Sequence, residues 1–227
     1  MLKDFPAGSV LADLDCDARE ELVWLGSRRQ YGAGSVLMRQ GEPPDVVYVL
    51  LDGYVKVTAI TEEGELAFLA VRSRGDLVGE IGVLDGSART ATVTAAGAIV
   101  AQRVSGPAFR AYLAQYPPAS AAVTRYVTRK FRSAIRRRLE YVSGSVRARL
   151  ARLLLELADH WGEQTPEGTV IAVGLNQAEL AALVGAVERS VNEALAELRT
   201  QGMVVVGYRR VVVKDTRKLN RVALGLG

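Results

Sequence analysis

Residues 78–93 read VGEIGVLDGSARTATV, and this stretch decides how the N-terminal half of the chain is interpreted. Gly79 and Gly82 carry no Cβ, so the backbone there can come close to a ligand. Arg89 supplies a forked donor that fits a phosphate, and Thr90 places a hydroxyl beside it. This combination of residues predicts a binding site for a small anion.

Short apolar runs lie on both sides of this stretch, and glycine-bearing turns separate them. Short strands at regular spacing with such turns indicate an all-β sandwich or barrel. The expected strands are Val36–Met38, Val46–Leu51, Tyr54–Ile60, Leu66–Val71, Ala91–Ala95 and Ile99–Val104. The N-terminal half is therefore predicted to be an antiparallel β-roll that contains the anion site.

Helical patterns occur on either side of the predicted strands. Residues 12–26 and Pro107–Gln115 are expected to form short helices, and the second ends at Tyr116-Pro117-Pro118. Residues 119–142 contain no Gly or Pro, and apolar side chains recur there at steps of three to four, with either Lys130 or Phe131 in the stripe. This spacing predicts a long amphipathic helix. Its apolar stripe fits a parallel homodimer, and packing against its own domain is the alternative.

The C-terminal part carries the pattern of a helix-turn-helix. Asn176 is followed three residues later by Glu179, which is the spacing of a capping box at a helix start. A turn with Gly185 separates this helix from a second one at about 187–200. Two short helices joined in this way are typical of DNA-binding domains.

Further elements complete this C-terminal domain. Ser143-Gly144-Ser145 is interpreted as a hinge before a helix that ends near Trp161-Gly162. A loop at Gln164–Gly168 and a strand at Val170–Val173 come next in this reading. The β runs Met203–Val206 and Val211–Lys214 then form a hairpin with a basic tip, which predicts a winged helix-turn-helix.

The charge distribution agrees with a nucleic-acid partner for the C-terminal half. Residues 1–118 hold 11 Lys and Arg against 15 Asp and Glu, whereas residues 119–227 hold 18 against 10. A basic half beside an acidic half suggests two tasks, with the basic half near a polyanion. A solvated helix face is the alternative explanation of the basic residues.

If the second helix enters the major groove, its first turns face base edges. Arg189 then reads guanine and Asn192 adenine, while Glu188 or Glu193 accepts from cytosine. The alternative for Glu188 is an intrahelical pair with Arg189 or Asn192. Arginines at the wing tip and Lys214 hold phosphates. The expected DNA contacts are Gln177, Glu188, Arg189, Ser190, Asn192, Glu193, Arg209 and Arg210.

The stretch that contains Gly79, Glu80 and Arg89 resembles the phosphate-binding cassette of cyclic-nucleotide-binding domains. Together with the long helix and the winged helix-turn-helix, the chain from about 14 to 215 resembles the Crp/Fnr family of bacterial transcription regulators. The resemblance implies a homodimer through 119–142 and a palindromic DNA site. It implies that Glu80 contacts the ribose 2′-hydroxyl, and that Arg89 and Thr90 contact the cyclic phosphate.

The sequence departs from the cAMP-responsive members of that family at two places. Ala134 and Ile135 stand where relatives use polar side chains to contact adenine, and neither side chain can donate a hydrogen bond. In the recognition helix, Glu188-Arg189 and Glu193 replace the family's usual order of charges. The residues expected at the ligand are Gly79, Glu80, Ile81, Gly82, Arg89, Thr90, Ala134 and Ile135.

The prediction is therefore an α+β protein with an N-terminal antiparallel β-roll (jelly-roll), a long dimerisation helix and a C-terminal winged helix-turn-helix. The expected domains are 1–118, 119–143 and 144–227. The expected function is DNA-binding transcription regulation switched by a cyclic nucleotide, with cAMP preferred and cGMP as a second candidate. A constitutive DNA binder and a nucleotide sensor acting on a protein partner are the alternatives. RNA polymerase is an expected partner if the protein activates transcription.

Several residue counts exclude other classes of protein. One cysteine, Cys16, and one histidine, His160, leave no Cys/His zinc cluster, iron–sulfur cluster or haem site. No nucleophile–base pair or Walker loop points to an enzyme. No run approaches the roughly 20 apolar residues of a membrane span, and no signal peptide opens the chain. A cytoplasmic protein is expected.

Overall fold

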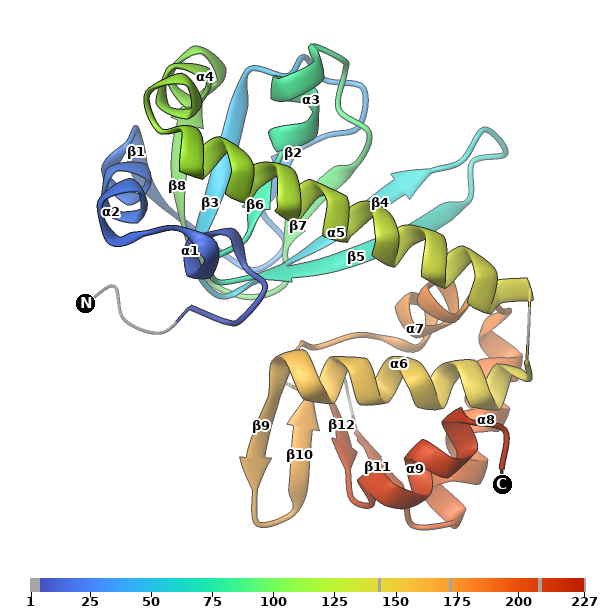
Figure 1. The fold of residues 1–227 in the computed structure, drawn as a ribbon. Helices are drawn as coiled ribbons and strands as arrows, with labels where there is room; N and C mark the ends of the chain where they lie inside the picture. The colour runs from blue at the N-terminus through green and yellow to red at the C-terminus, as the bar shows by residue number, and fades with distance from the viewer. Residues whose placement is uncertain (1–4, 143, 172, 208–209, 227) are drawn as a thin grey trace. The chain divides into compact units, whose positions relative to one another are not determined.

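The computed structural model describes residues 5–142, 144–171, 173–207 and 210–226, and Figure 1 shows the order of the elements. The chain divides into two compact units, with the boundary between Ala134 and Ile135.

The first unit is a sandwich of two antiparallel four-stranded sheets. The sheet orders are β1-β8-β3-β6 and β2-β7-β4-β5. The strands are β1 (Ser27–Tyr31), β2 (Val36–Met38), β3 (Val46–Asp52), β4 (Tyr54–Ile60), β5 (Leu66–Ser73), β6 (Leu77–Val78), β7 (Thr92–Ala95) and β8 (Ile99–Ser105). The predicted β-roll is confirmed, and all six predicted runs form strands.

Strand β3 is buried on both faces, which explains its unbroken apolar sequence. Tyr48 and Leu50 pack with residues of the opposite sheet, whereas Val47 and Val49 pack with the helices. Side chains alternate between the two faces of a strand, so one strand can serve two cores. Strand β3 therefore packs against the helices with one face and against the opposite sheet with the other.

Two strands of the first unit escaped the sequence analysis. β1 is an edge strand that pairs only with β8 among the described strands, and its arginines Arg28 and Arg29 are exposed. A strand that shows its side chains to water lacks the apolar alternation that marks a buried one. β6 has two residues and is too short for any periodicity.

The helices that lie wholly in the first unit are α1 (Val10–Asp13), α2 (Cys16–Trp24), α3 (Glu80–Asp85) and α4 (Gly106–Gln115), and α5 (Pro117–Val142) begins in this unit and crosses the boundary. The single helix expected over residues 12–26 is in fact the two helices α1 and α2, and α3 was not predicted. The long helix begins at Pro117 and not at Ala119 as predicted. Proline is accommodated in the first turn of a helix, because the N–H it lacks would have no intrahelical partner there. Only Tyr116 separates α4 from α5.

The two ends of α5 differ in exposure. Ala122, Val123 and Tyr126 are buried in the core of the first unit. Farther along the helix, Phe131 is 65% exposed and Leu139 is 66% exposed. The beginning of α5 thus packs against its own domain, and the later part presents an apolar stripe to solvent.

Tyr112 on α4 should make the first unit sensitive to alkali. Its hydroxyl donates a hydrogen bond of 2.8 Å to the Ala18 carbonyl, and burial followed by the nearby Asp15 carboxylate raises its pKa. The unfolded chain loses this proton near pH 10, so the stabilisation is complete below pH 10 and is lost as the pH rises further.

Above pH 10, deprotonation of Tyr112 lowers the unfolding free energy of the wild type by up to about 1.4 kcal/mol per pH unit. We expect Tyr112→Phe to lack this contribution. Below pH 9 the variant is less stable by about 1 kcal/mol, because one hydrogen bond is missing. Urea unfolding between pH 8 and 11.5 measures both effects. An alkaline slope equal to that of the wild type would contradict the role assigned to this hydroxyl.

The second unit contains α6 (Val146–Trp161), β9 (Gly162–Thr165), β10 (Gly168–Ile171), α7 (Gln177–Val184), α8 (Glu188–Thr200), β11 (Val204–Gly207), β12 (Arg210–Val213) and α9 (Thr216–Ala223). Its strands form one antiparallel sheet of order β11-β12-β10-β9. The predicted helix-turn-helix and β-hairpin are confirmed. Ser143, at the predicted hinge, lies outside the described residues.

Three elements of this unit differ from the prediction. The strand expected at Val170–Val173 is β10, which begins at Gly168 and ends at Ile171. The predicted loop at Gln164–Gly168 is shorter, because Gln164 and Thr165 belong to β9 and Gly168 opens β10. Strand β9 is polar and partly exposed, so its sequence lacks the apolar pattern that predicts a strand. Helix α9 was not predicted, although Asp215 caps it by accepting a hydrogen bond from the Lys218 backbone N–H.

Candidate effector site and nucleic-acid interface

The cassette begins where strand β6 meets helix α3. Gly79 has φ +84°, and a Cβ there would lie 2.7 Å from Met38 Cε and 2.8 Å from Arg89 Nη1. A Cβ on Gly82 would lie 2.8 Å from the Ser87 carbonyl oxygen. Both glycines are therefore required by close packing of the chain itself, in addition to any ligand.

Arg89 is buried and binds the main chain of neighbouring segments. Its Nη1 donates to the Gly79 carbonyl at 2.7 Å, and its Nη2 donates to the Val46 carbonyl at 2.5 Å. The Asp45 carboxylate lies 3.4 Å from Nη2 and is exposed. The adjacent Thr90 is exposed. Arg89 thus links β3 to the cassette, while the hydroxyl-bearing residue beside it faces solvent.

Glu80 is buried at the first turn of α3 and is bound by a residue of the long helix. Lys130 Nζ donates to Glu80 Oε1 at 2.8 Å and to the Leu77 carbonyl at 2.9 Å. The same ammonium lies 4.4 Å from the centroid of the Tyr126 ring. The Glu80 side chain is 2% exposed. The carboxylate is thus neutralised by a cation from α5.

The environment of Lys130 acts on its pKa in two directions. Burial lowers the pKa, and the Glu80 carboxylate partly opposes this effect. The sequence analysis did not assign a function to Lys130, although it placed this residue beside Phe131 on the apolar side of the helix. The presence of a lysine at an apolar position of an amphipathic helix is the sequence signal that could have identified Lys130 as a functional residue.

The other residues predicted at the ligand are on the surface of the chain. Ile81 on α3 is 38% exposed and Ile135 on α5 is 44% exposed. Ala134 is exposed as well. As expected from their side chains, Ala134 and Ile135 offer no hydrogen bond to a base.

The helix-turn-helix is fixed by main-chain and side-chain caps. The predicted capping box is present: Asn176 Oδ1 accepts from the Glu179 N–H, and Glu179 Oε2 accepts from the Asn176 N–H, both at 2.8 Å. Gly185 ends α7 in a left-handed conformation. The following helix α8 begins after Val187, which provides no side-chain cap.

Arg149 on α6 holds the turn of the helix-turn-helix, and the sequence analysis missed it. Its Nε donates to the Val184 carbonyl at 3.0 Å and its Nη2 donates to the Gly185 carbonyl at 3.3 Å. Its Nη1 donates to the Gly144 carbonyl at 3.0 Å. A single guanidinium therefore connects the end of α7 to the segment before α6.

The predicted DNA contacts differ in how they lie. The exposed ones are Gln177, Glu188, Arg189, Glu193 and Arg210. Ser190 and Asn192 are half-buried, and Asn192 Oδ1 is buried without a hydrogen-bond partner among the described residues. Arg209 lies outside the described residues.

Two of the exposed arginines are paired with carboxylates. Arg189 Nε donates to Glu193 Oε1 at 3.0 Å, one turn along α8. Arg210 Nη2 donates to Glu167 Oε2 at 3.0 Å, which joins the wing to the turn between β9 and β10. Each of these arginines therefore already has a carboxylate partner within the chain, and the partner of Arg189 is Glu193 and not Glu188.

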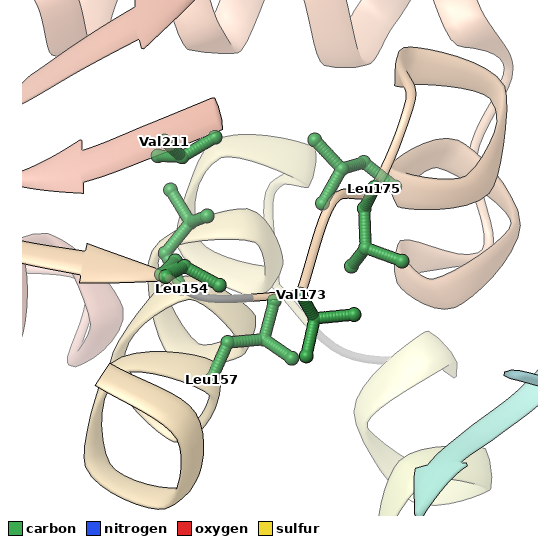
Figure 2. Close-up of a pocket in the computed structure, with 7 residues that line it drawn as sticks. Leu154, Leu157, Val173, Leu175 and Val211 are labelled. Atoms are coloured by element: carbon green, nitrogen blue, oxygen red, sulfur yellow. The ribbon is translucent and has the colours of Figure 1, made fainter. Parts of the chain in front are cut away.

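A small apolar cavity lies inside the second unit (Figure 2). Its walls are Leu154, Leu157, Ile171, Val173, Leu175, Leu180 and Val211. The space admits about one water-sized sphere, about 10 Å³, which is the minimum for a single water molecule. Because the walls are apolar and the space is small, we interpret the cavity as a packing gap beneath the helix-turn-helix.

In the described part of the chain, no group of three or more His, Cys, Asp or Glu side chains is arranged to hold a metal ion. Likewise, no described helix is long and apolar enough to cross a membrane.

Comparison with known proteins assigns both units to characterised domain families. The cyclic nucleotide-binding domain family matches residues 28–116. The Crp-like helix-turn-helix domain family matches residues 148–222. The two matches coincide with the β-sandwich that carries the cassette and with the unit that carries α7 and α8.

Two relatives match this chain over most of their own length. The transcriptional regulator LdrP of Thermus thermophilus is 30% identical over 199 residues, which cover 86% of this chain and 96% of that protein. The CRP-like cAMP-activated global transcriptional regulator of Mycobacterium tuberculosis is 29% identical over 190 residues, covering 84% of this chain and 85% of that protein.

A solved structure gives the same answer for the fold. A CRP-family transcriptional regulator from Thermus thermophilus has a TM-score of 0.74 at 28% identity, over 86% of this chain and 96% of that one. The β-sandwich, the long helix and the winged helix-turn-helix occur in one chain in the family's order. The protein is therefore a member of the Crp/Fnr family of DNA-binding transcription regulators, with a cyclic-nucleotide-binding domain and a Crp-like helix-turn-helix domain.

Proposed function

We propose that this regulator acts as a homodimer that binds a palindromic double-stranded DNA site under the control of a cyclic nucleotide, with cAMP as the preferred effector. The effector domain is residues 1–118, the dimerisation helix 119–143 and the DNA-binding domain 144–227. RNA polymerase is a partner if the protein activates transcription. The choice of cAMP over cGMP rests on relatives that are described as cAMP-activated.

The contact between Glu80 and Lys130 is the observation that carries this proposal. It joins the cassette to α5, the helix that leads toward the DNA-binding unit. A ribose hydroxyl that donates to Glu80 changes how strongly this carboxylate holds Lys130. A ligand shifts a conformational equilibrium only if it binds the two states differently, and this contact supplies such a difference.

Arg89 supports phosphate binding without giving up its structural contacts. A guanidinium carries five N–H donors, and three contacts are recorded for Arg89. The remaining donors and the exposed Thr90 hydroxyl are the groups we assign to a cyclic phosphate. Gly79, Ile81 and Gly82 form the backbone around it, and Ala134 and Ile135 face the base without hydrogen bonding.

A constitutive regulator is the second candidate. It is favoured by one observation: Glu80 and Arg89 already have partners within the chain. In that case the cassette is a structural core that needs no ligand, and DNA binding is independent of nucleotide.

Calorimetric titration of the full chain with cAMP, cGMP and AMP distinguishes the two candidates. We expect heat with one cyclic nucleotide, little with AMP, and weaker binding in Thr90→Val. Thr90→Val is chosen because its side chain is exposed and the substitution removes a hydroxyl but little volume. An absence of heat and of thermal stabilisation at millimolar ligand would instead favour the constitutive regulator.

The DNA-binding half of the proposal places α8 in the major groove. Half-sites about 34 Å apart match two recognition helices related by a dimer axis. Residues on the exposed side of α8 read bases, and Gln177, Arg209 and Arg210 contact phosphates. The binding of a palindromic duplex selected from a random library tests this arrangement.

The exposed stripe on α5 should hold the dimer together. We expect the pair of substitutions Phe131→Glu and Leu139→Glu to produce a monomer of 24.4 kDa, because four carboxylates would be buried in the interface. Analytical ultracentrifugation measures the mass. Ile60→Glu is the control, since Ile60 is also about half-exposed but lies on β4. A wild-type monomer, or a dimeric double variant, would contradict this use of α5.

A further inference from the structure

The exposed side of the recognition helix carries a pair of charged residues whose geometry is specific. Arg189 is 89% exposed and Glu193 is 61% exposed, and they lie one helical turn apart. The recorded contact uses Nε of Arg189 and Oε1 of Glu193, at 3.0 Å. Among the described residues, no other partner is recorded for the two terminal nitrogens of Arg189.

The choice of Nε matters because a guanidinium has two distinct edges. One edge carries Nε–H and one terminal N–H, and the end of the group carries two parallel N–H donors on the terminal nitrogens. Guanine presents N7 and O6 as two neighbouring acceptors in the major groove. A carboxylate on Nε therefore leaves the end of the guanidinium available for a bidentate contact with guanine.

The Glu193 carboxylate on Nε also restrains the conformation of the Arg189 side chain. An exposed arginine loses up to about 2 kcal/mol of rotamer entropy when it is fixed in one conformation. In water an i,i+4 pair contributes only about 0.3–0.5 kcal/mol, so Glu193 restrains Arg189 weakly in the free protein. In a groove that excludes water the same contact strengthens, because the local dielectric falls.

Glu193 has an alternative role as a direct reader of cytosine. That role requires its carboxylate to accept from the cytosine N4 amine, while phosphates repel it on both sides of the groove. As a partner of Arg189 it is instead beside a positive charge, which offsets the repulsion. The observed contact favours the second role.

We propose that Arg189 and Glu193 form one recognition unit, in which Arg189 reads a guanine with its two terminal nitrogens and Glu193 is a positioning residue for it. This inference rests on the proposed binding of DNA by α8. It assigns one guanine per half-site to Arg189 and no separate base pair to Glu193. Glu188, at the start of the helix, is outside the unit.

The test begins with a half-site that the full-length wild type selects from random DNA, with effector if the titrations require one. Affinities are then measured for all four base pairs at each position, and for 7-deazaguanine, which lacks the N7 acceptor. We expect Arg189→Ala to lower discrimination for one guanine by roughly 5- to 150-fold. At the same position 7-deazaguanine should weaken wild-type binding but not binding by Arg189→Ala.

Glu193→Gln should lower the preference for that same guanine and leave the other positions unchanged. Its effect should disappear in the Arg189→Ala background, because the two residues act together. Glu197→Gln is the control that removes the same charge one turn farther along α8, where Glu197 is more than half exposed and lies 3.6 Å from Arg147 Nε. It should raise affinity for all sequences alike, without changing the preference for guanine.

Two results would overturn the inference. If Glu193→Gln relaxes a different base pair, with an effect independent of Arg189, Glu193 reads DNA itself. If neither substitution changes any base preference while the wild type still selects a site, the pair does not read sequence. A wild type that selects no DNA site, with or without a nucleotide, would reject the proposed function instead.

Discussion

Lys130→Met is expected to lower the unfolding free energy of the N-terminal unit by about 3–5 kcal/mol near pH 7.5. This range is typical when one partner of a buried ion pair is removed and the other charge stays behind. The remaining charge is the Glu80 carboxylate, whose side chain is 2% exposed. Among the described residues, Lys130 is the only cation that forms an ion pair with it. The methionine fills a similar volume, so loss of packing is minor.

Urea unfolding at pH 7.5, with hydrogen exchange of β3 as the probe of this unit, measures the effect. The control is the double variant Lys130→Met with Glu80→Gln, in which no charge is buried. It should recover most of the lost stability, because a neutral pair avoids the cost of an unpaired carboxylate. A single variant as stable as the wild type at pH 7.5 would show that the Glu80–Lys130 contact contributes little.

Arg89→Leu is expected to have an effect of similar size, about 3–5 kcal/mol on the same unit. The substitution removes the donors to two main-chain carbonyls, those of Gly79 and Val46. A buried polar group left without a partner costs about 1–3 kcal/mol, and Arg89 also loses its ion pair with Asp45. Arg89→Lys should recover only part of this, since a single ammonium lacks the fork that reaches both carbonyls.

Arg103→Gln is the matched control for Arg89. Arg103 also lies near Asp45, at 3.8 Å, but its side chain is 44% exposed. Exposed ion pairs contribute about 0–1 kcal/mol, so this variant should unfold almost as the wild type does. Equal destabilisation by the Arg89 and Arg103 variants would show that the contacts of Arg89 with the main chain are not important for stability.

This structural role changes how a binding experiment on Arg89 is interpreted. A variant at this position that fails to bind nucleotide has also lost part of the fold around the cassette. Thr90→Val lacks this difficulty because the side chain is exposed. The assignment of the phosphate site is therefore better tested at Thr90 than at Arg89.

Local patterns in the sequence were sufficient for the elements whose signals are short-range. The strands of the sandwich follow from apolar runs between glycine turns, and the start of α7 follows from the reciprocal contacts of Asn176 and Glu179. Such features depend on a few neighbouring residues and on the period of the chain. Polar edge strands such as β1 and β9 lack this period and were missed.

The sequence by itself determined the order of the apolar strands and the main helices, the family resemblance and the positions of Glu80 and Arg89. Only the tertiary structure decided what those two side chains contact: Glu80 binds Lys130, 50 residues away, and Arg89 binds a carbonyl 43 residues away. Lys130 has a local signal in its apolar helix position, but no local pattern pairs it with Glu80 or pairs Arg89 with Val46, because the backbone path brings these residues together. A buried charge must find a partner, and the fold determines which one is within reach.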